Sequence, residues 1–139
     1  MKVVSTEQMR LLDRRAIEEF EIPGEELMAR AGHGVADRVM HLADRSGYHD
    51  PVVHLFAGRG NNGGDAFAAA RYLYEQEYEL EVWLAGSVDE VRGDALSHLS
   101  RMRAAGVPLR ELPTLEDWEG ALHGYEGSDI LVDGVLGIG

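Results

Sequence analysis

The sequence lacks cysteine, has few basic residues and contains no long apolar run. Without cysteine, disulfide bonds, thiolate catalysis and thiolate metal ligands are excluded. Lys and Arg number 13 against 25 Asp and Glu, which gives a net charge of −12. A nucleic-acid surface needs a basic face to neutralise phosphates, so we expect no nucleic-acid partner. No apolar run approaches the ~20 residues of a membrane span, so we expect no membrane partner either.

Other functional patterns are also missing. The six histidines show neither His-x-x-x-His nor His-Glu-x-x-His spacing, and no serine lies in a Gly-x-Ser-x-Gly elbow. The first seven residues lack the apolar core of a secretory signal, so we expect a cytoplasmic location. A length of 139 residues fits one domain, residues 1–139.

The first fifty residues have helical periodicity. Ser5 or Thr6 can cap a helix whose apolar residues continue to Phe20. A second helix is expected from about Pro23 to Arg45. Two glycines within it, at 32 and 34, predict a kink or close packing.

Strands and helices alternate after residue 50. We expect strands at 51–57, 80–85, 107–112 and 129–133, and helices at 65–75, 89–104 and 114–122. This alternation predicts an α/β, Rossmann-like three-layer fold with a mostly parallel sheet, preceded by the two N-terminal helices. The usual strand order puts the first strand at the centre, strands two and three on one side, and strand four on the other.

A glycine-rich loop, Gly58-Arg-Gly-Asn-Asn-Gly-Gly-Asp65, joins the first strand to its helix. It satisfies G-x-G-x-x-G in the strand-to-helix context that this pattern requires. Its glycines allow a ligand to approach the backbone, and the following helix offers unpaired N–H groups to a phosphate. The alternative is a loop whose glycines serve packing alone.

Two features distinguish this loop from that of a dehydrogenase. The second strand ends at Trp83-Leu-Ala-Gly86 without the acidic residue that normally holds an adenosine ribose, and Asp89 beyond it is expected to cap a helix. Asp65 is expected in the first helical turn, where a carboxylate favours the helix dipole but repels a pyrophosphate. The ligand is therefore expected to be held differently from NAD in a dehydrogenase.

Two polar features complete the predicted site. Asn61 and Asn62 carry amide groups that suit phosphates or hard cations, or that form simple Asx turns. Asp133 ends the fourth strand. It therefore reaches the same sheet edge as the loop, at the topological switch point where α/β sheets bind ligands. Its alternative role is to cap the next turn.

Several segments resemble the YjeF N-terminal domain family, the NAD(P)HX epimerases. Residues 56–65 are similar to the family's Gly-Pro-Gly-Asn-Asn-Gly-Gly-Asp-Gly signature. The segments at 9–16, 22–24 and 27–32 resemble its N-terminal helices, and residues 129–139 resemble its Asp-Ala-Leu-Phe-Gly-Thr-Gly segment. The match spans nearly the whole chain in the right order.

The resemblance implies an isomerase that interconverts the R and S forms of hydrated NADH and NADPH (NADHX and NADPHX). It implies dinucleotide contacts from Asn61, Asn62, Gly63, Gly64 and Asp65, and a second contact from Gly137, Ile138 and Gly139. It also implies a potassium ion held by Asn62 and Asp133. Epimerisation needs an acid or base, and Asp65 and Asp133 are the candidates for this catalytic role. A homodimer and fusion to an ADP/ATP-dependent dehydratase domain are further implications.

Some positions depart from the family pattern. Arg59 replaces a proline, which adds a phosphate contact or loosens the loop, while Ala66 replaces a glycine and Ile138 a threonine. Family members continue for roughly another third, so the C-terminal part of the fold is expected to be missing and the fourth strand to be an open edge. We therefore expect a longer natural protein, or a partner for this stretch. The alternative function is a non-catalytic module of the same fold that binds a nucleotide or a protein.

Overall fold

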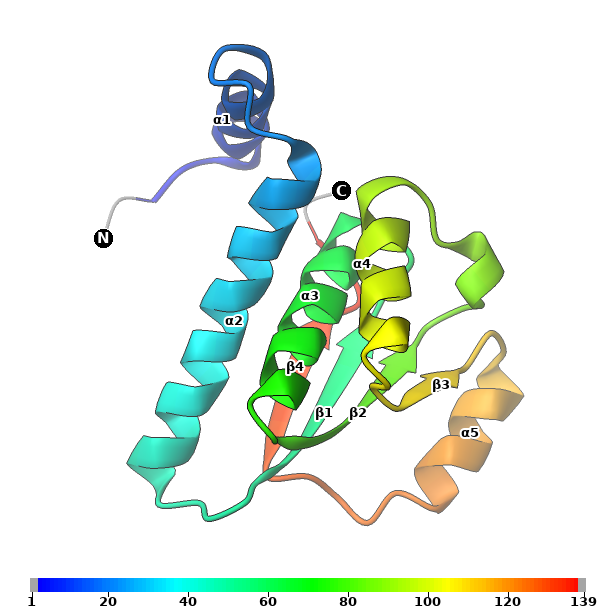
Figure 1. Cartoon of the computed structure of the whole chain (residues 1–139). Coiled ribbons are helices and arrows are strands. Elements are labelled where there is room, and N and C mark those ends of the chain that lie inside the picture. The colour runs from blue at the N-terminus through cyan, green and yellow to red at the C-terminus, as the bar shows by residue number, and fades with distance from the viewer. Residues whose placement is uncertain (1–2, 138–139) are drawn as a thin grey trace.

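The computed structural model describes residues 3–137 (Figure 1). Its elements, in chain order, are α1 (Thr6–Glu18), α2 (Gly24–Ser46), β1 (Val52–Ala57), α3 (Asn61–Glu75), β2 (Glu79–Leu84), the 3-10 turn η1 (Val88–Glu90), α4 (Gly93–Ala104), β3 (Leu109–Glu111), α5 (Leu115–His123) and β4 (Ile130–Gly134). None of the helices in this part of the chain is long and apolar enough to cross a membrane.

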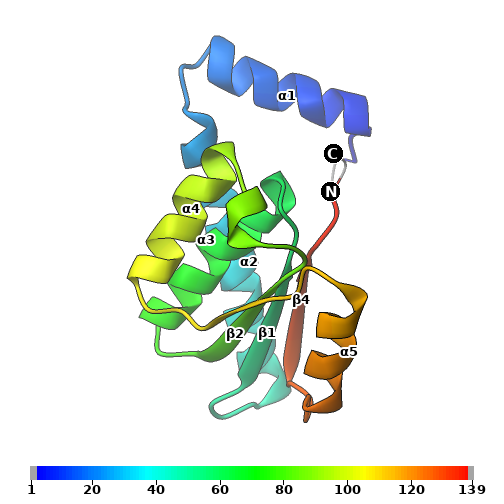
Figure 2. The same cartoon turned by 90° about the vertical axis from the view of Figure 1, so that its right-hand side faces the viewer.

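The four strands form one parallel sheet in the order β3-β2-β1-β4, as predicted. Helices α2, α3 and α4 cover one face, and α5 lies on the other (Figure 2). The three-layer α/β fold is therefore confirmed. Because all strands run the same way, the loops after β1, β2 and β4 meet at one edge of the sheet.

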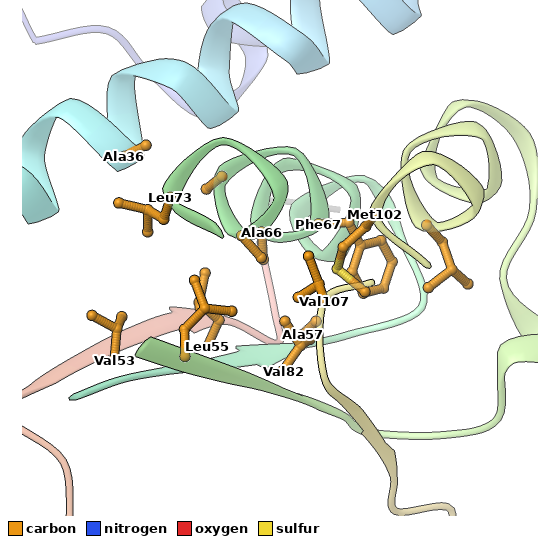
Figure 3. Close-up of a cluster of buried hydrophobic side chains, with 14 of the residues drawn as sticks. Ala36, Val53, Leu55, Ala57, Ala66, Phe67, Leu73, Val82, Met102 and Val107 are labelled. Carbon is orange, nitrogen blue, oxygen red and sulfur yellow. The ribbon is translucent and has the colours of Figure 1, made fainter. Parts of the chain in front are cut away.

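The main core lies between the sheet and α3 (Figure 3). Val53, Leu55 and Ala57 alternate along β1 towards this layer and are fully buried, as are Phe67 and Leu73 of α3. Complete burial of a side chain as large as Phe67 contributes about 1.5–3 kcal/mol. The helix that carries the predicted site is therefore rigidly anchored to the central strand.

A smaller aromatic cluster lies on the opposite face, beneath α5. Trp83 is 2% exposed and contacts Phe56, Trp118 and Tyr125 through edge-on rings. This cluster holds α5 to the sheet. Thr114 caps α5 through a capping box with Asp117.

Helix α1 forms where the sequence predicts it. Ser5 caps it, as expected, with Gln8 completing a capping box. Its apolar residues are not buried, however: Met9 is 41% exposed and Ile17 46% exposed. In Figure 2, α1 crosses above the carboxyl ends of the strands rather than packing on the sheet.

Two helix predictions need correction in detail. Helix α2 runs unbroken through both glycines, and only the close packing is confirmed: a Cβ on Gly32 would lie 2.5 Å from Cβ of Ala68. The helix predicted at 89–104 divides, because Val91 is extended and α4 starts at Gly93. Leu96 of α4 is 40% exposed.

Candidate active site

Helix α3 begins at Asn61, four residues earlier than predicted, so the Asn-Asn-Gly-Gly segment is its first turn. Glycine disfavours a helix, which is why the sequence suggested a loop. Packing requires these glycines. A Cβ on Gly63 would lie 1.8 Å from the carbonyl oxygen of Gly58, and a Cβ on Gly64 would lie 2.3 Å from Sδ of Met28. Their missing side chains therefore make room for protein rather than for a ligand.

The backbone of this turn remains available to a ligand. Gly64 N–H donates to the carbonyl of Gly60 at 3.0 Å. Within the described part of the chain, Asn61, Asn62 and Gly63 have no acceptor for their N–H groups. Unpaired N–H groups and the positive end of the helix dipole favour an anion here. The first turn of α3 therefore has the geometry that suits an anion, and phosphate binding there stays a prediction.

The turn after β4 packs against this helix start. Gly58 N–H donates to the carbonyl of Gly134 at 2.9 Å, and Asn62 Nδ2 donates to the carbonyl of Leu136 at 2.9 Å. A Cβ on Gly137 would lie 3.3 Å from Cγ of Asn62. The structure therefore brings Asn62 and Gly137 together, as the site requires. Ile138 and Gly139, predicted to belong to the same contact, lie outside the described residues.

A cavity of about 1030 Å³ opens over the helix start. It is large enough for a dinucleotide-sized ligand to enter in part. The lining residues come from α1, the loop after β1, the start of α3, the end of β2 and the turn after β4: Met9, Arg10, Asp13, Gly58, Arg59, Gly60, Asn61, Asn62, Asp65, Ala85, Val135, Leu136 and Gly137.

Asp65 is the predicted site residue with the most perturbed environment. It is the fifth residue of α3, so the expectation that it lies in the first turn is wrong. It lines both the large cavity and an adjoining cavity of about 220 Å³. Burial, and secondly the negative charge of Asp13, raise the pKa of the Asp65 carboxyl to about 6. A carboxyl with this pKa can both donate and accept a proton near neutral pH.

Asp133 does not line either cavity that Asp65 lines. It pairs with Phe56 in the sheet register and faces the α5 side, where it lines a cavity of about 400 Å³ with Phe56 and Trp118. Its Oδ1 accepts a hydrogen bond from Val135 N at 3.0 Å, so it caps the turn after β4. Asp65 lines the two cavities over the start of α3, whereas Asp133 lines two cavities along β4. The two predicted catalytic carboxyls therefore open onto different cavities.

The two residues predicted to hold potassium, Asn62 of α3 and Asp133 of β4, both form hydrogen bonds with the turn after β4. Asn62 is bound to this turn through its nitrogen and Asp133 through Oδ1. Oδ1 of Asn62 and Oδ2 of Asp133 receive no hydrogen bond from the described residues, and potassium binding by these two residues stays a prediction. No group of three or more His, Asp or Glu suited to a metal occurs in residues 3–137.

Arg59 fastens the loop to the end of β2. Its Nη1 lies 2.6 Å from Oε1 of Glu90, whose other oxygen accepts a hydrogen bond from Ser87 N. A Cβ on Gly86 would lie 2.6 Å from Cδ of Arg59, so the glycine makes room for this side chain. Arg59 thus restrains the loop instead of loosening it. The helical turn here is capped by Ser87, not by Asp89 as predicted.

Sequence reasoning missed the contribution of α1 to the site. Met9, Arg10 and Asp13 line the cavity because α1 crosses above the sheet edge, and this long-range placement leaves no local signal. On β1, His54 Nδ1 is buried without a partner among the described residues, and its Nε2 lies 3.6 Å from Oε2 of Glu81.

Known proteins match the chain over most of its length. An NAD(P)H-hydrate epimerase of Rhodopirellula baltica is 33% identical over 98% of this chain and 52% of the relative. One of Rhodobacter capsulatus is 32% identical over 99% of this chain and 63% of the relative. A bifunctional NAD(P)H-hydrate repair enzyme of Archaeoglobus fulgidus is 35% identical over the whole chain and 26% of the relative.

The crystal structure of the yeast protein ynu0 superimposes with a TM-score of 0.81 at 26% identity, covering 99% of this chain and 58% of the yeast chain. The chain thus spans about half the length of the epimerase relatives, and a quarter of the bifunctional one. A family model described as YjeF-related protein N-terminus matches residues 24–139. The chain therefore belongs to the family of YjeF-related N-terminal domains.

Proposed function

We propose that this chain carries the substrate site of an NAD(P)H-hydrate epimerase, which interconverts the R and S forms of NADHX and NADPHX. The observation that carries the proposal is the first turn of α3. Its free N–H groups and Asp65 open onto one large cavity, and Asn62 fixes the turn after β4 beside them. Relatives with the same domain bear the name of this activity.

Binding would start at the phosphates. The N–H groups of Asn61, Asn62 and Gly63 would bind phosphate oxygens, aided by the helix dipole. Gly64 supports this turn by packing against Met28 and Ala95 rather than by touching the ligand. Gly137 would let the ligand pass close to the backbone of the turn after β4.

Asp65 is the acid or base that the site supports best. Inversion at a hydrated carbon needs a proton delivered to the departing hydroxyl and a proton removed from the water that returns. The raised pKa of Asp65 suits both transfers. Asp133 belongs to the cation-binding part of the proposal, because its carboxylate opens onto a different cavity.

Asn62 and Asp133 would hold the potassium ion through oxygen atoms. A bound cation would supply positive charge close to the phosphates and the turn. Asn62 and Asp133 themselves hold the turn after β4 in place, through their bonds to Leu136 and Val135.

Partners of the domain follow from its relatives. This chain matches about a quarter of the length of proteins named as bifunctional repair enzymes. We therefore propose that the domain also works next to a second catalytic domain, a dehydratase dependent on ADP or ATP. A homodimer in the cytoplasm is the expected state of the protein.

Feeding pure R- or S-NADHX and NADPHX to the protein, as its gene encodes it, tests the proposal. We expect interconversion that is faster in potassium than in tetramethylammonium. Asp133→Asn should lose most of this potassium response, whereas Asp37→Asn, an exposed carboxylate on α2, should keep it. A folded protein that binds NADPHX without interconverting the isomers would contradict the proposal and favour a non-catalytic module.

A further inference from the structure

Helix α1 has features of a functional element rather than a structural one. None of its residues from Thr6 to Glu18 is buried, so packing against the sheet does not explain its position. Met9, Asp13 and Ile17 nevertheless recur at four-residue spacing and line the two adjoining cavities. One face of α1 therefore forms a wall of the candidate active site.

Asp13 is the charged residue on this face that approaches Asp65. Both residues line both cavities, and Asn61 is shared with them. The negative charge of Asp13 acts on the Asp65 carboxyl strongly enough to contribute to its raised pKa, after burial. Asp65 is partly buried on α3, whereas Asp13 is exposed on α1.

We propose that Asp13 and Asp65 form a carboxyl pair in which Asp65 transfers the proton of the epimerisation and Asp13 positions that proton on Asp65. The pair rests on the proposed function, and it assigns a role to α1. A carboxyl beside a second negative charge ionises less readily, so the charge of Asp13 raises the pH at which Asp65 loses its proton. Burial of Asp65 acts in the same direction and is the larger cause.

The pair accounts for each proton in the reaction. Asp65 donates its proton to the hydroxyl on the hydrated carbon, and the C–O bond breaks with its electrons leaving in water. The positive charge that forms on the ring lies close to the carboxylates of Asp65 and Asp13. Water then adds to the opposite face of the carbon and returns its proton to Asp65, so the pair ends in its starting state.

Other charged groups surround the pair. Asp94 of α4 lines the smaller cavity, and its carboxylate lies towards Gly24 at the start of α2. Arg10 of α1 and Arg59 of the loop line the larger cavity, and Arg59 is paired with Glu90. Of these groups, Asp13 is the one whose charge adds to the effect of burial on Asp65.

Two measurements on the same variants test the pair. The first is the NMR titration of the Asp65 carboxyl, which needs no substrate, and the second is the pH profile of epimerisation. Asp13→Asn should move the Asp65 titration and the pH profile to lower pH. The shift should be less than half of the difference between the ordinary pKa of 3.8 and the pKa of about 6, because burial is the larger cause of the raised pKa. The rate at pH 7 should then fall by up to about tenfold, since one pH unit is a tenfold change in protonation.

Asp13→Glu should restore both readouts, and Glu18→Gln, an equal charge change on α1 outside both cavities, should alter neither. An unchanged Asp65 titration in Asp13→Asn would overturn the pair. A shifted titration with an unchanged pH profile would overturn its role in catalysis. A shifted titration in a protein that epimerises nothing would overturn the proposed function and this role together, while the electrostatic pair would stand.

Discussion

Replacing Asp65 with Asn should make the protein more stable at pH 7, although it removes the proposed proton donor. The pKa of Asp65 is about 6 in the folded protein against an ordinary value of 3.8, so folding favours the protonated form. Above pH 6 the ionised carboxylate opposes folding in full, and this opposition disappears as the pH falls through 6 towards 3.8. The difference between the two pKa values corresponds to about 3 kcal/mol of lost folding stability. Because the side chain is partly exposed to solvent, we expect a loss of about 1–3 kcal/mol.

The difference in the free energy of unfolding between Asp65→Asn and the unchanged protein measures the cost of the ionised carboxylate. Urea unfolding at several pH values should give a variant about 1–3 kcal/mol more stable at pH 7, with the difference close to zero near pH 4. Asp37→Asn on α2 provides a matched control and should change stability by less than about 0.5 kcal/mol at either pH. Equal stability of Asp65→Asn and the unchanged protein at pH 7 would refute the argument that Asp65 is held in an unfavourable, functional environment.

Two further predictions concern glycines. Gly32→Ala should destabilise the protein by about 1–3 kcal/mol, because the added Cβ would lie 2.9 Å from backbone atoms of α3. Gly34→Ala in the same helix is the control. Its Cβ would meet nothing within 4 Å, so it should stabilise the protein by up to about 1 kcal/mol. Similar values for the two variants in thermal unfolding would contradict the close crossing of α2 and α3. Gly63→Ala should cost at least about 2 kcal/mol, because its Cβ would overlap the carbonyl of Gly58, and it should weaken NADPHX binding as the helix start shifts. Unaltered stability and affinity in calorimetry would show that this turn tolerates a side chain.

The sheet could be predicted because its signals are local. Short apolar runs at β1, β2 and β4 alternate with helical periodicity, and parallel βαβ connections allow few strand orders. Helix α1 was predicted as a helix for the same reason, since Ser5 and Gln8 provide its cap. Its position was not predictable, because four-residue apolar spacing does not say whether a face packs on a core or borders a cavity.

The site was predicted in part. Asn61, Asn62 and Asp65 do surround one cavity, because the strand-to-helix pattern fixes where the first turn of α3 must lie. The start of that helix was placed too late, since glycine pairs resemble a turn in sequence and only tertiary packing shows their use. Asp133 reaches the expected sheet edge, but alternation along β4 directs its side chain to the α5 face.

Disagreements between local sequence preference and the fold gather at the candidate active site. A helix that starts with Asn-Asn-Gly-Gly is disfavoured by propensity, a partly buried carboxylate opposes folding, and an amphipathic α1 leaves its apolar residues exposed. Structural stability alone would favour a neutral side chain at Asp65 and a buried α1. The core beneath α3, centred on Phe67, supplies the stability that lets these features persist. Their concentration around one cavity is therefore independent physical support for a catalytic rather than a purely structural role of this domain.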